Sequence, residues 1–152
     1  MNGKIGKKRA AALFGTAFAR FFAMLVFAIA PAGLEVAFAE SAPEIKTLSI
    51  DEGYALVEEN SRNPDFVIVD VRMESEFRVG HLENAVNYDY YAETFRDDLG
   101  ALDKTKTYFV YCRSGSRSER AVEIMEKLGF TKVFNLNGGY VQWEKKGYPV
   151  AR

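Results

Sequence analysis

The sequence of 152 residues has little cysteine and histidine: Cys112 and His81 are the only residues of their types. One cysteine cannot form a disulfide within its own chain. One cysteine and one histidine, far apart in sequence, cannot supply the four ligands of a closed zinc site. The sequence also lacks a glycine-rich motif for nucleotide phosphates. We therefore expect a protein that uses neither a metal nor a cofactor.

The chain also lacks a surplus of positive charge. Its 20 lysines and arginines face 21 aspartates and glutamates. Five of these basic residues and one acidic residue precede Glu40, so residues 40–152 carry a net charge of −5. Nucleic acids and anionic membrane surfaces select basic proteins. We expect neither as a partner.

The first 39 residues have the pattern of a secretory signal peptide. A basic start at residues 4–9, an apolar stretch to residue 30 and the small-residue triplet Ala37-Phe38-Ala39 follow the usual order. An uncleaved membrane anchor is the alternative, because residues 21–38 approach the roughly 20 apolar residues that span a bilayer. Glu35 within that stretch argues against the anchor. The sequence predicts a periplasmic or secreted protein that contacts a membrane only if the segment is retained.

Residues 40–152 have the length of one small domain. We divide them into a linker and first strand at 40–48 and a main domain at 49–152. Unbroken apolar residues at 66–69 indicate a strand that is covered on both faces, as in a parallel sheet. Because strands alternate with helices, we predict an α/β fold whose central parallel sheet has helices on both faces. The expected strands are 45–48, 66–69, 85–87, 107–111 and 132–136, and the expected helices are 50–59, 74–78, one or two within 88–102, one ending at Gly129 and one after Gly139.

Cys112 lies between the strand at 107–111 and a helix, a position that favours an anion because the first N–H groups of a helix lack partners. Nearby arginines, here Arg113 and Arg117, also lower the pKa of a thiol. Gly115 allows the backbone to curl so that its N–H groups point inward. The alternative is a buried cysteine that serves only as a small apolar side chain. The polar loop that follows favours a reactive thiolate.

Two serines of this loop are candidates for the start of the helix. Ser116 with Glu119 has the spacing of a capping box, and Ser118 is a second candidate N-cap.

Several motifs in order are similar to those of the rhodanese domain. The resemblance rests on Asp70-Val71-Arg72, Glu76-Phe77, Gly80-His81-Leu82, Asn84-Ala85-Val86-Asn87, the loop from Cys112 to Ser118, Gly129-Phe130, and Leu136-Asn137-Gly138-Gly139 with Trp143. It implies a single-domain sulfurtransferase that moves a sulfane sulfur through a persulfide on Cys112. The implied substrate-binding residues are Arg113, Ser114, Gly115, Ser116, Arg117 and Ser118.

The resemblance implies a supporting role for four other residues. Asp70, Arg72, Glu76 and His81 would brace the loops around the site. A lone histidine near acidic residues also suggests a charge relay, but a thiolate that is already ionised needs little general-base help. We therefore expect His81→Ala to lower mainly stability. The aromatic cluster Tyr88, Tyr90, Tyr91 and Phe95 is expected to fill core, with a substrate entrance or a docking surface as alternatives.

The loop length helps to choose among three functions. Arg117 follows Cys112 with four residues between them, whereas related dual-specificity phosphatases have five and a wider loop for phosphate. The shorter loop favours sulfur. The expected partners are a small donor such as thiosulfate and an acceptor, either cyanide or a thiol. The alternatives are an exported sulfur carrier that serves an acceptor protein, and a phosphatase or arsenate reductase, which the loop length disfavours.

Overall fold

The computed structural model describes residues 42–152, so the expected signal peptide at 1–39 lies outside the described residues. Seven strands and five helices make up the described part of the chain. In order they are β1 Glu44–Leu48, α1 Ile50–Glu59, β2 Phe66–Asp70, α2 Glu74–Val79, β3 His81–Leu82, β4 Val86–Asn87, α3 Phe95–Gly100, β5 Thr107–Tyr111, α4 Ser116–Lys127, β6 Lys132–Leu136, α5 Gly139–Lys145 and β7 Val150–Ala151.

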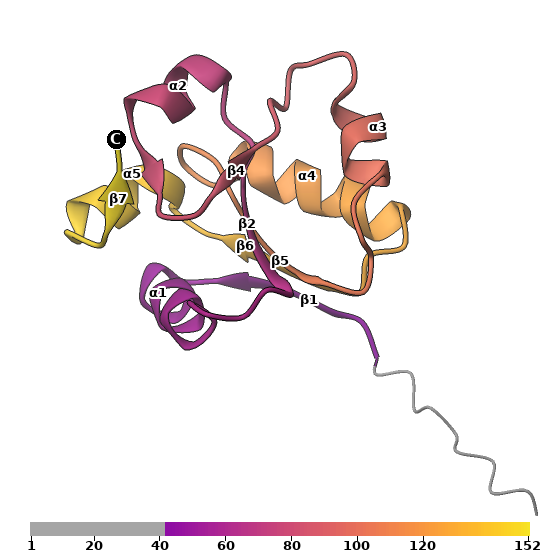
Figure 1. The fold of residues 1–152 in the computed structure, drawn as a ribbon, viewed down its shortest axis with the longest axis horizontal. Coiled ribbons are helices and arrows are strands. Elements are labelled where there is room, and N and C mark those ends of the chain that lie inside the picture. The colour runs from indigo at the N-terminus through magenta and orange to yellow at the C-terminus, as the bar shows by residue number, and fades with distance from the viewer. Residues whose placement is uncertain (1–41) are drawn as a thin grey trace, which may run out of the picture. The chain divides into compact units, whose positions relative to one another are not determined.

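Five strands form one parallel sheet in the order β1-β6-β5-β2-β4. The remaining two, β3 and β7, form a small antiparallel pair that the sequence did not predict. In the large sheet β5 is the central strand, with β6 and β2 beside it. Figure 1 shows α1 and α5 on one side of this sheet and α3 and α4 on the other. The predicted fold class, a parallel sheet covered by helices on both faces, is confirmed.

Alternate residues of β5 enter two separate cores, as the twofold periodicity of a strand requires. Tyr108 and Val110 belong to the core under α3 and α4, together with Met125 of α4. Phe109 and Tyr111 belong to the core under α1 and α5. The strand is therefore buried on both faces, which explains its unbroken apolar sequence.

A capping box starts α1. The backbone N–H of Glu52 donates to Ser49 Oγ, and the Ser49 N–H donates to the Glu52 carboxylate at 2.8 Å. Within this helix Gly53 faces the sheet closely, because a Cβ there would lie 2.6 Å from Leu136 Cδ1. The glycine lets α1 pack directly on the side chains of β6.

The segment between β4 and β5 contains one helix, within the predicted one or two. Only α3 forms there, and residues 88–94 are irregular. The Tyr88 N–H donates to the Asp70 carbonyl at 3.0 Å and the Tyr90 N–H donates to the Val71 carbonyl at 3.4 Å. These bonds hold the segment against the end of β2 and occupy the N–H groups of Tyr88 and Tyr90.

The prediction of a serine cap for α4 is wrong. The N-cap is Gly115, whose φ of 110° lies in the left-handed region. The Gly115 carbonyl accepts the N–H of Glu119 at 2.9 Å, which starts the helix one residue earlier than a Ser116 cap would. Ser118 lies inside the helix and its hydroxyl donates to the Gly115 carbonyl at 2.9 Å. Glycine is used because the loop needs a conformation that serine rarely adopts.

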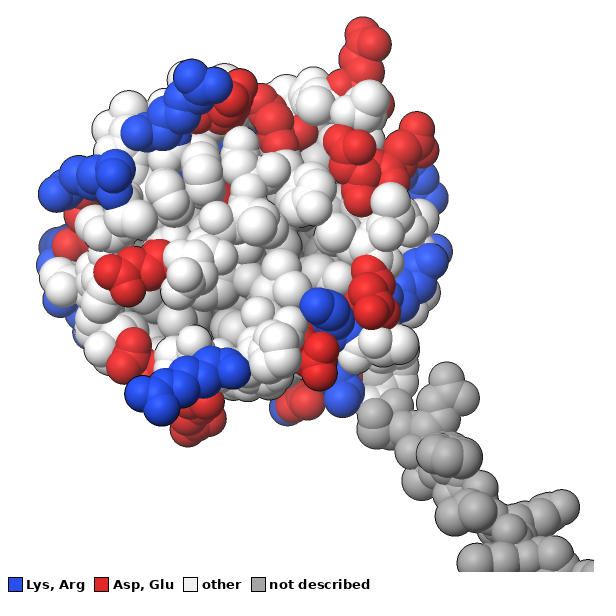
Figure 2. Space-filling model, viewed as in Figure 1, with Lys and Arg blue, Asp and Glu red and all other residues white. Residues whose placement is uncertain are grey.

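The surface carries charges of both signs. On the face shown in Figure 2, basic and acidic side chains lie mainly around the outline, with several acidic ones together at the upper right, and the middle is mostly uncharged. Within residues 42–152, no helix combines the length and the apolar character needed to cross a membrane.

Candidate active site at the Cys112 loop

The Cys112 loop begins at the carboxyl end of the central strand β5, and its first residues are fixed from two sides. The Val71 N–H after β2 donates to the Tyr111 carbonyl at 2.9 Å. At the start of α5, the N–H groups of Tyr140 and Val141 donate to the carbonyls of Cys112 and Arg113 at 2.8 and 3.1 Å. The carboxyl ends of parallel strands are the usual place for reactive groups in such sheets.

Two glycines give the loop its shape. Gly115 has a φ of 110° and turns the chain back toward Cys112. Gly139 has a φ of 54°, and a Cβ on it would collide with the Cys112 carbonyl oxygen and lie 2.8 Å from the Arg113 carbonyl. The close approach of α5 to the loop therefore requires glycine at position 139.

The sulfur atom of Cys112 faces donors from its own loop. The Gly115 N–H donates to Sγ at 3.2 Å, and the Ser118 hydroxyl lies 3.6 Å from it. Burial raises the pKa of the Cys112 thiol, but hydrogen bonds from the backbone and side chain of Ser118 and from the N–H groups of Ser114 and Gly115 lower it by more. The net effect is a lowered pKa, as hydrogen bonding to the charged form produces.

The side chain of Cys112 is buried, with 1% of its surface exposed, and it joins the core under α3 and α4. Arg113 and Ser114, which follow it, are exposed. A small substrate must therefore approach the sulfur across the loop, where these two residues meet solvent.

The two loop arginines have different surroundings. Arg117 donates to the Glu76 carboxylate at 2.9 and 3.2 Å, and its guanidinium lies 5.7 Å from the ring centre of Tyr91. The hydrogen bond with Glu76 is the main cause that raises the pKa of Arg117. No ion pair joins Arg113 to any acidic side chain between residues 42 and 152. Arg113 is thus the loop arginine whose charge has no compensating partner there.

Asp70 and Arg72 form a buried ion pair at the end of β2. The Arg72 guanidinium donates to Asp70 Oδ2 at 2.6 Å and to the Gly80 carbonyl at 2.7 Å, and neither side chain is more than 4% exposed. The guanidinium also lies 4.1 Å from the ring centre of Tyr140, the residue that binds the Cys112 carbonyl. The pair therefore links β2, α2 and α5 around the loop without reaching the sulfur.

His81 lies in β3 and contacts α2. Its Nδ1 is 3.0 Å from the Phe77 carbonyl oxygen, and its ring stacks on that of Phe77 with centres 3.8 Å apart. Neither interaction involves a residue of the Cys112 loop.

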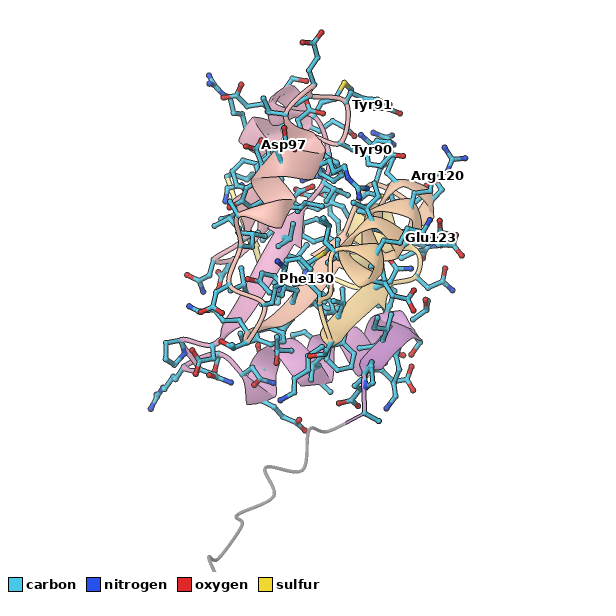
Figure 3. The ribbon with its side chains drawn as sticks, turned by 90° about the vertical axis from the view of Figure 1, so that its right-hand side faces the viewer. Tyr90, Tyr91, Asp97, Arg120, Glu123 and Phe130 are labelled. Carbon is cyan, nitrogen blue, oxygen red and sulfur yellow. The ribbon has the colours of Figure 1, made fainter. Side chains whose placement is uncertain are left out.

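The aromatic cluster after β4 divides in two. Tyr88, Tyr90 and Phe95 pack in or against the core under α3 and α4. Tyr91 is 66% exposed and lies over Arg117. Figure 3 shows the rings of Tyr90 and Tyr91 together above the first part of α4, from which Arg120 and Glu123 project outward.

Sequence reasoning missed three residues that support the site. The Asn87 side chain donates to the carbonyls of Asp70 and Arg72, both at 2.9 Å, and so fixes the turn after β2. Tyr140 and Val141 hold the loop through their N–H groups. The glycine pair at the start of α5 was the only sequence signal for this contact. It indicated a tight turn but not that the turn would pack against the Cys112 loop.

Among the described residues, no group of three or more acidic, histidine or cysteine side chains could hold a metal ion.

Comparison with known proteins places this geometry in a family. A model of the rhodanese-like domain matches residues 54–146. The rhodanese-related protein of Thermoplasma volcanium is 30% identical with a TM-score of 0.58, covering 70% of this chain and 97% of that one. A rhodanese-like domain protein of Staphylococcus aureus is 31% identical with a TM-score of 0.54, covering 64% of this chain and 90% of that one.

A curated relative carries a more specific name. The tRNA uridine(34) hydroxylase of Photorhabdus laumondii is 36% identical over 98 residues, which are 58% of this chain and 27% of that protein. The chain spans between 25% and 28% of the length of this and two similar hydroxylases. The family match, by contrast, covers more than half of the chain and includes the whole Cys112 loop. The protein therefore belongs to the family of rhodanese-like domains.

Proposed function

We propose that the protein is a sulfurtransferase that carries a sulfane sulfur from a donor such as thiosulfate to a thiophilic acceptor. The observation that supports this most directly is the Cys112 sulfur, whose pKa is lowered by loop donors within a rhodanese-like domain. The same donors suit a persulfide, which is also a sulfur anion. The loop residues 113–118 form the substrate-binding segment of the proposal.

In the loading step, the Cys112 thiolate attacks the outer sulfur of thiosulfate. A bond forms between Sγ and that sulfur, the bond to the central sulfur breaks, and the electron pair leaves with sulfite. In the second step, an acceptor thiolate or cyanide attacks the outer sulfur of the persulfide and returns the electron pair to Sγ. The net charge and the number of electrons are unchanged in each step, so no external oxidant is needed. This is covalent catalysis through one nucleophile.

The test uses residues 40–152 with thiosulfate as the donor. We expect intact-mass spectrometry to find one added sulfur atom, and cyanide to release it as thiocyanate. Cys112→Ser should take up no sulfur while its circular dichroism spectrum stays unchanged. Failure of the wild-type protein to load from thiosulfate or from an organic persulfide would refute the proposal.

The relatives suggest a second candidate, because 36% identity to tRNA uridine(34) hydroxylases is substantial. Their activity belongs to proteins about four times as long as the matched segment. The net charge of −5 for residues 40–152 also gives no attraction for RNA. Modification of tRNA uridine that depends on Cys112, without persulfide loading, would favour this candidate over sulfur transfer.

We further propose export through cleavage after Ala39. Expression of the full sequence in a bacterium with a periplasm should yield a periplasmic protein whose mass begins at Glu40. A full-length product that remains in the membrane fraction would instead support the anchor.

A further inference from the structure

A groove beside the Cys112 loop offers a site for the acceptor. Its volume is about 460 Å³, and its lining includes Glu76, Val79, Arg113, Tyr140, Val141 and Glu144. We call it the loop-side groove. The Cys112 loop contributes Arg113 to this lining, and Tyr140 and Val141 of the lining bind the carbonyls of Cys112 and Arg113, whereas the Cys112 side chain itself is buried in the core under α3 and α4. Another cavity of about 230 Å³, between α1 and Trp143, contains no residue of the loop.

The size of the groove exceeds what the donor needs. Thiosulfate has five heavy atoms, whereas cavities of about 300–1,000 Å³ typically hold organic ligands. Val79 is 76% exposed and Val141 is 42% exposed, and both line the groove. These two valines provide apolar surface next to the loop, which an aliphatic substrate would cover. The dimensions and the apolar lining therefore fit an organic molecule better than a small inorganic anion.

The charges of the groove leave one cation without a partner. Every other charged side chain in the lining has an ion-pair partner among residues 42–152. The pairs are Arg72 with Asp70 at 2.6 Å, Glu76 with Arg117 at 2.9 Å and Arg152 with Glu144 at 3.4 Å. Arg113 is exposed and has no such partner in the same part of the chain. The groove thus presents one uncompensated positive charge beside apolar surface.

We propose that the loop-side groove binds the body of an acceptor thiol that bears a carboxylate, with Arg113 pairing with that carboxylate. The inference rests on the proposed function, since it names the acceptor class for the same site. A guanidinium binds a carboxylate with two parallel hydrogen bonds. The aliphatic part of the thiol covers Val79 and Val141, and its thiolate reaches the outer sulfur of the Cys112 persulfide. The acceptor leaves as a persulfide, and the electron pair of the broken bond returns to Cys112 Sγ.

The kinetic test compares two acceptors that differ only in charge, N-acetylcysteine and N-acetylcysteinamide, at equal thiolate concentration. We expect Arg113→Gln to raise the KM of N-acetylcysteine about fivefold to tenfold, the loss of one charge-assisted contact. The KM of the amide should change much less. Arg113→Lys should fall between, because it keeps the charge and loses the fork. Arg120→Gln is the matched control, since this exposed arginine of α4 does not line the groove and points outward in Figure 3.

A binding test separates this inference from the proposed function. Cys112→Ser protein, which cannot carry a persulfide, is titrated with N-acetylcysteine and followed by methyl NMR. Val79 and Val141 should shift in that protein, and the added change Arg113→Gln should weaken binding. Equal effects of Arg113→Gln on both acceptors, slower thiosulfate loading as its main effect, or titration shifts elsewhere would overturn the inference. Absence of persulfide in the wild-type protein, with binding in the groove retained, would refute the proposed function alone.

Discussion

The Cys112 sulfur is surrounded by donors from residues that follow it in the chain. The Gly115 N–H lies 3.2 Å away and the Ser118 hydroxyl 3.6 Å away, while burial acts in the opposite direction on the thiol pKa. Two opposing effects of this kind make the reactivity depend on individual hydrogen bonds. Removal of one donor should therefore be measurable.

Ser118→Ala should make Cys112 less reactive at neutral pH. The change removes a hydroxyl that favours the thiolate and leaves the burial of the sulfur intact. A hydrogen bond to a charged group contributes about 1.5–3 kcal/mol, but this contact contributes less, because the distance is 3.6 Å and the same hydroxyl donates to the Gly115 carbonyl at 2.9 Å. We expect alkylation by iodoacetamide at pH 7 to be roughly threefold to tenfold slower, with its pH profile moved upward.

Ser116→Ala provides the comparison, because Ser116 is exposed and donates no side-chain hydrogen bond to the sulfur. An unchanged alkylation profile for Ser118→Ala would show that the backbone donors alone hold the thiolate.

Glu76 should make the free energy of unfolding depend on pH. Its hydrogen bond with Arg117 is the main cause that lowers its pKa from 4.5, and both side chains are about 15% exposed. A lowered pKa in the folded state adds stability that is complete above the pKa of the unfolded glutamate and is lost as pH falls through the lowered value. We expect Glu76→Gln to lower the free energy of unfolding at pH 7 by about 1–2 kcal/mol.

The test is urea denaturation of both proteins between pH 7 and pH 3. The gap between wild type and Glu76→Gln should close as the pH falls below about 4.5. A gap that stays constant across this range would mean that the variant acts through packing instead of charge. Glu74→Gln is the control, because its ion pair with Arg78 is exposed.

His81→Ala should lower stability and leave persulfide loading intact. The ring stacks on Phe77 and Nδ1 lies 3.0 Å from the Phe77 carbonyl, so the loss concerns the contact of β3 with α2. We expect about 1 kcal/mol less free energy of unfolding. His81→Phe, which keeps a stacked ring, should recover part of it. Loss of persulfide loading in His81→Ala with wild-type stability would contradict this prediction and indicate a catalytic role for His81.

At the scale of the elements, α5 controls the shape of the Cys112 loop. Its first two N–H groups after Gly139 bind the loop carbonyls, and among residues 42–152 the hydrogen bonds to the sulfur come from Gly115 and Ser118 of the loop and α4, not from α5. The helix therefore fixes the backbone of the loop at Cys112 and Arg113. This contact depends on the small size of one residue.

Gly139→Ala should separate α5 from the loop. The added Cβ would collide with the Cys112 carbonyl, and the φ of 54° is unfavourable for alanine. We expect a loss of about 2–3 kcal/mol in unfolding free energy and a larger fall in persulfide loading than stability alone explains. Gly100→Ala, where no atom lies within 4 Å of the added Cβ, is the control. Wild-type loading in Gly139→Ala would show that α5 does not shape the loop.

At the scale of the whole molecule, β1 is part of the sheet although it precedes the predicted main domain. Its five residues pair with β6 from Glu44 to Leu48, and Ile45 and Leu48 pack against the two cores. A chain that begins at Ser49 should therefore have a free energy of unfolding about 2–4 kcal/mol lower than a chain that begins at Glu40. Its urea midpoint should be lower as well. Lys46→Ala, an exposed change in the same strand, should have little effect. Equal midpoints for the two chains would make β1 dispensable.

Local sequence patterns determined the five strands of the parallel sheet, the fold class and the place of Cys112, but not the short pair β3 and β7. The apolar runs of β2, β5 and β6 are fixed by burial on both faces, and the Ser49 capping box needs only residues three apart. A cysteine after the central strand followed by glycine and small polar residues likewise carries its own local signal. These features depend on neighbours in the chain, so the sequence alone contains them.

Only the tertiary structure decided which groups surround the loop. It assigned Glu76 to Arg117 across 41 residues, placed α5 against the loop through Gly139, and left Arg113 without an acidic partner in residues 42–152. It also showed that the N-cap of α4 is Gly115 and not a serine, because the loop curls around Sγ through the left-handed conformation of Gly115. The physical reason is that ion pairs and backbone approaches depend on distances between segments, which packing sets and local spacing does not.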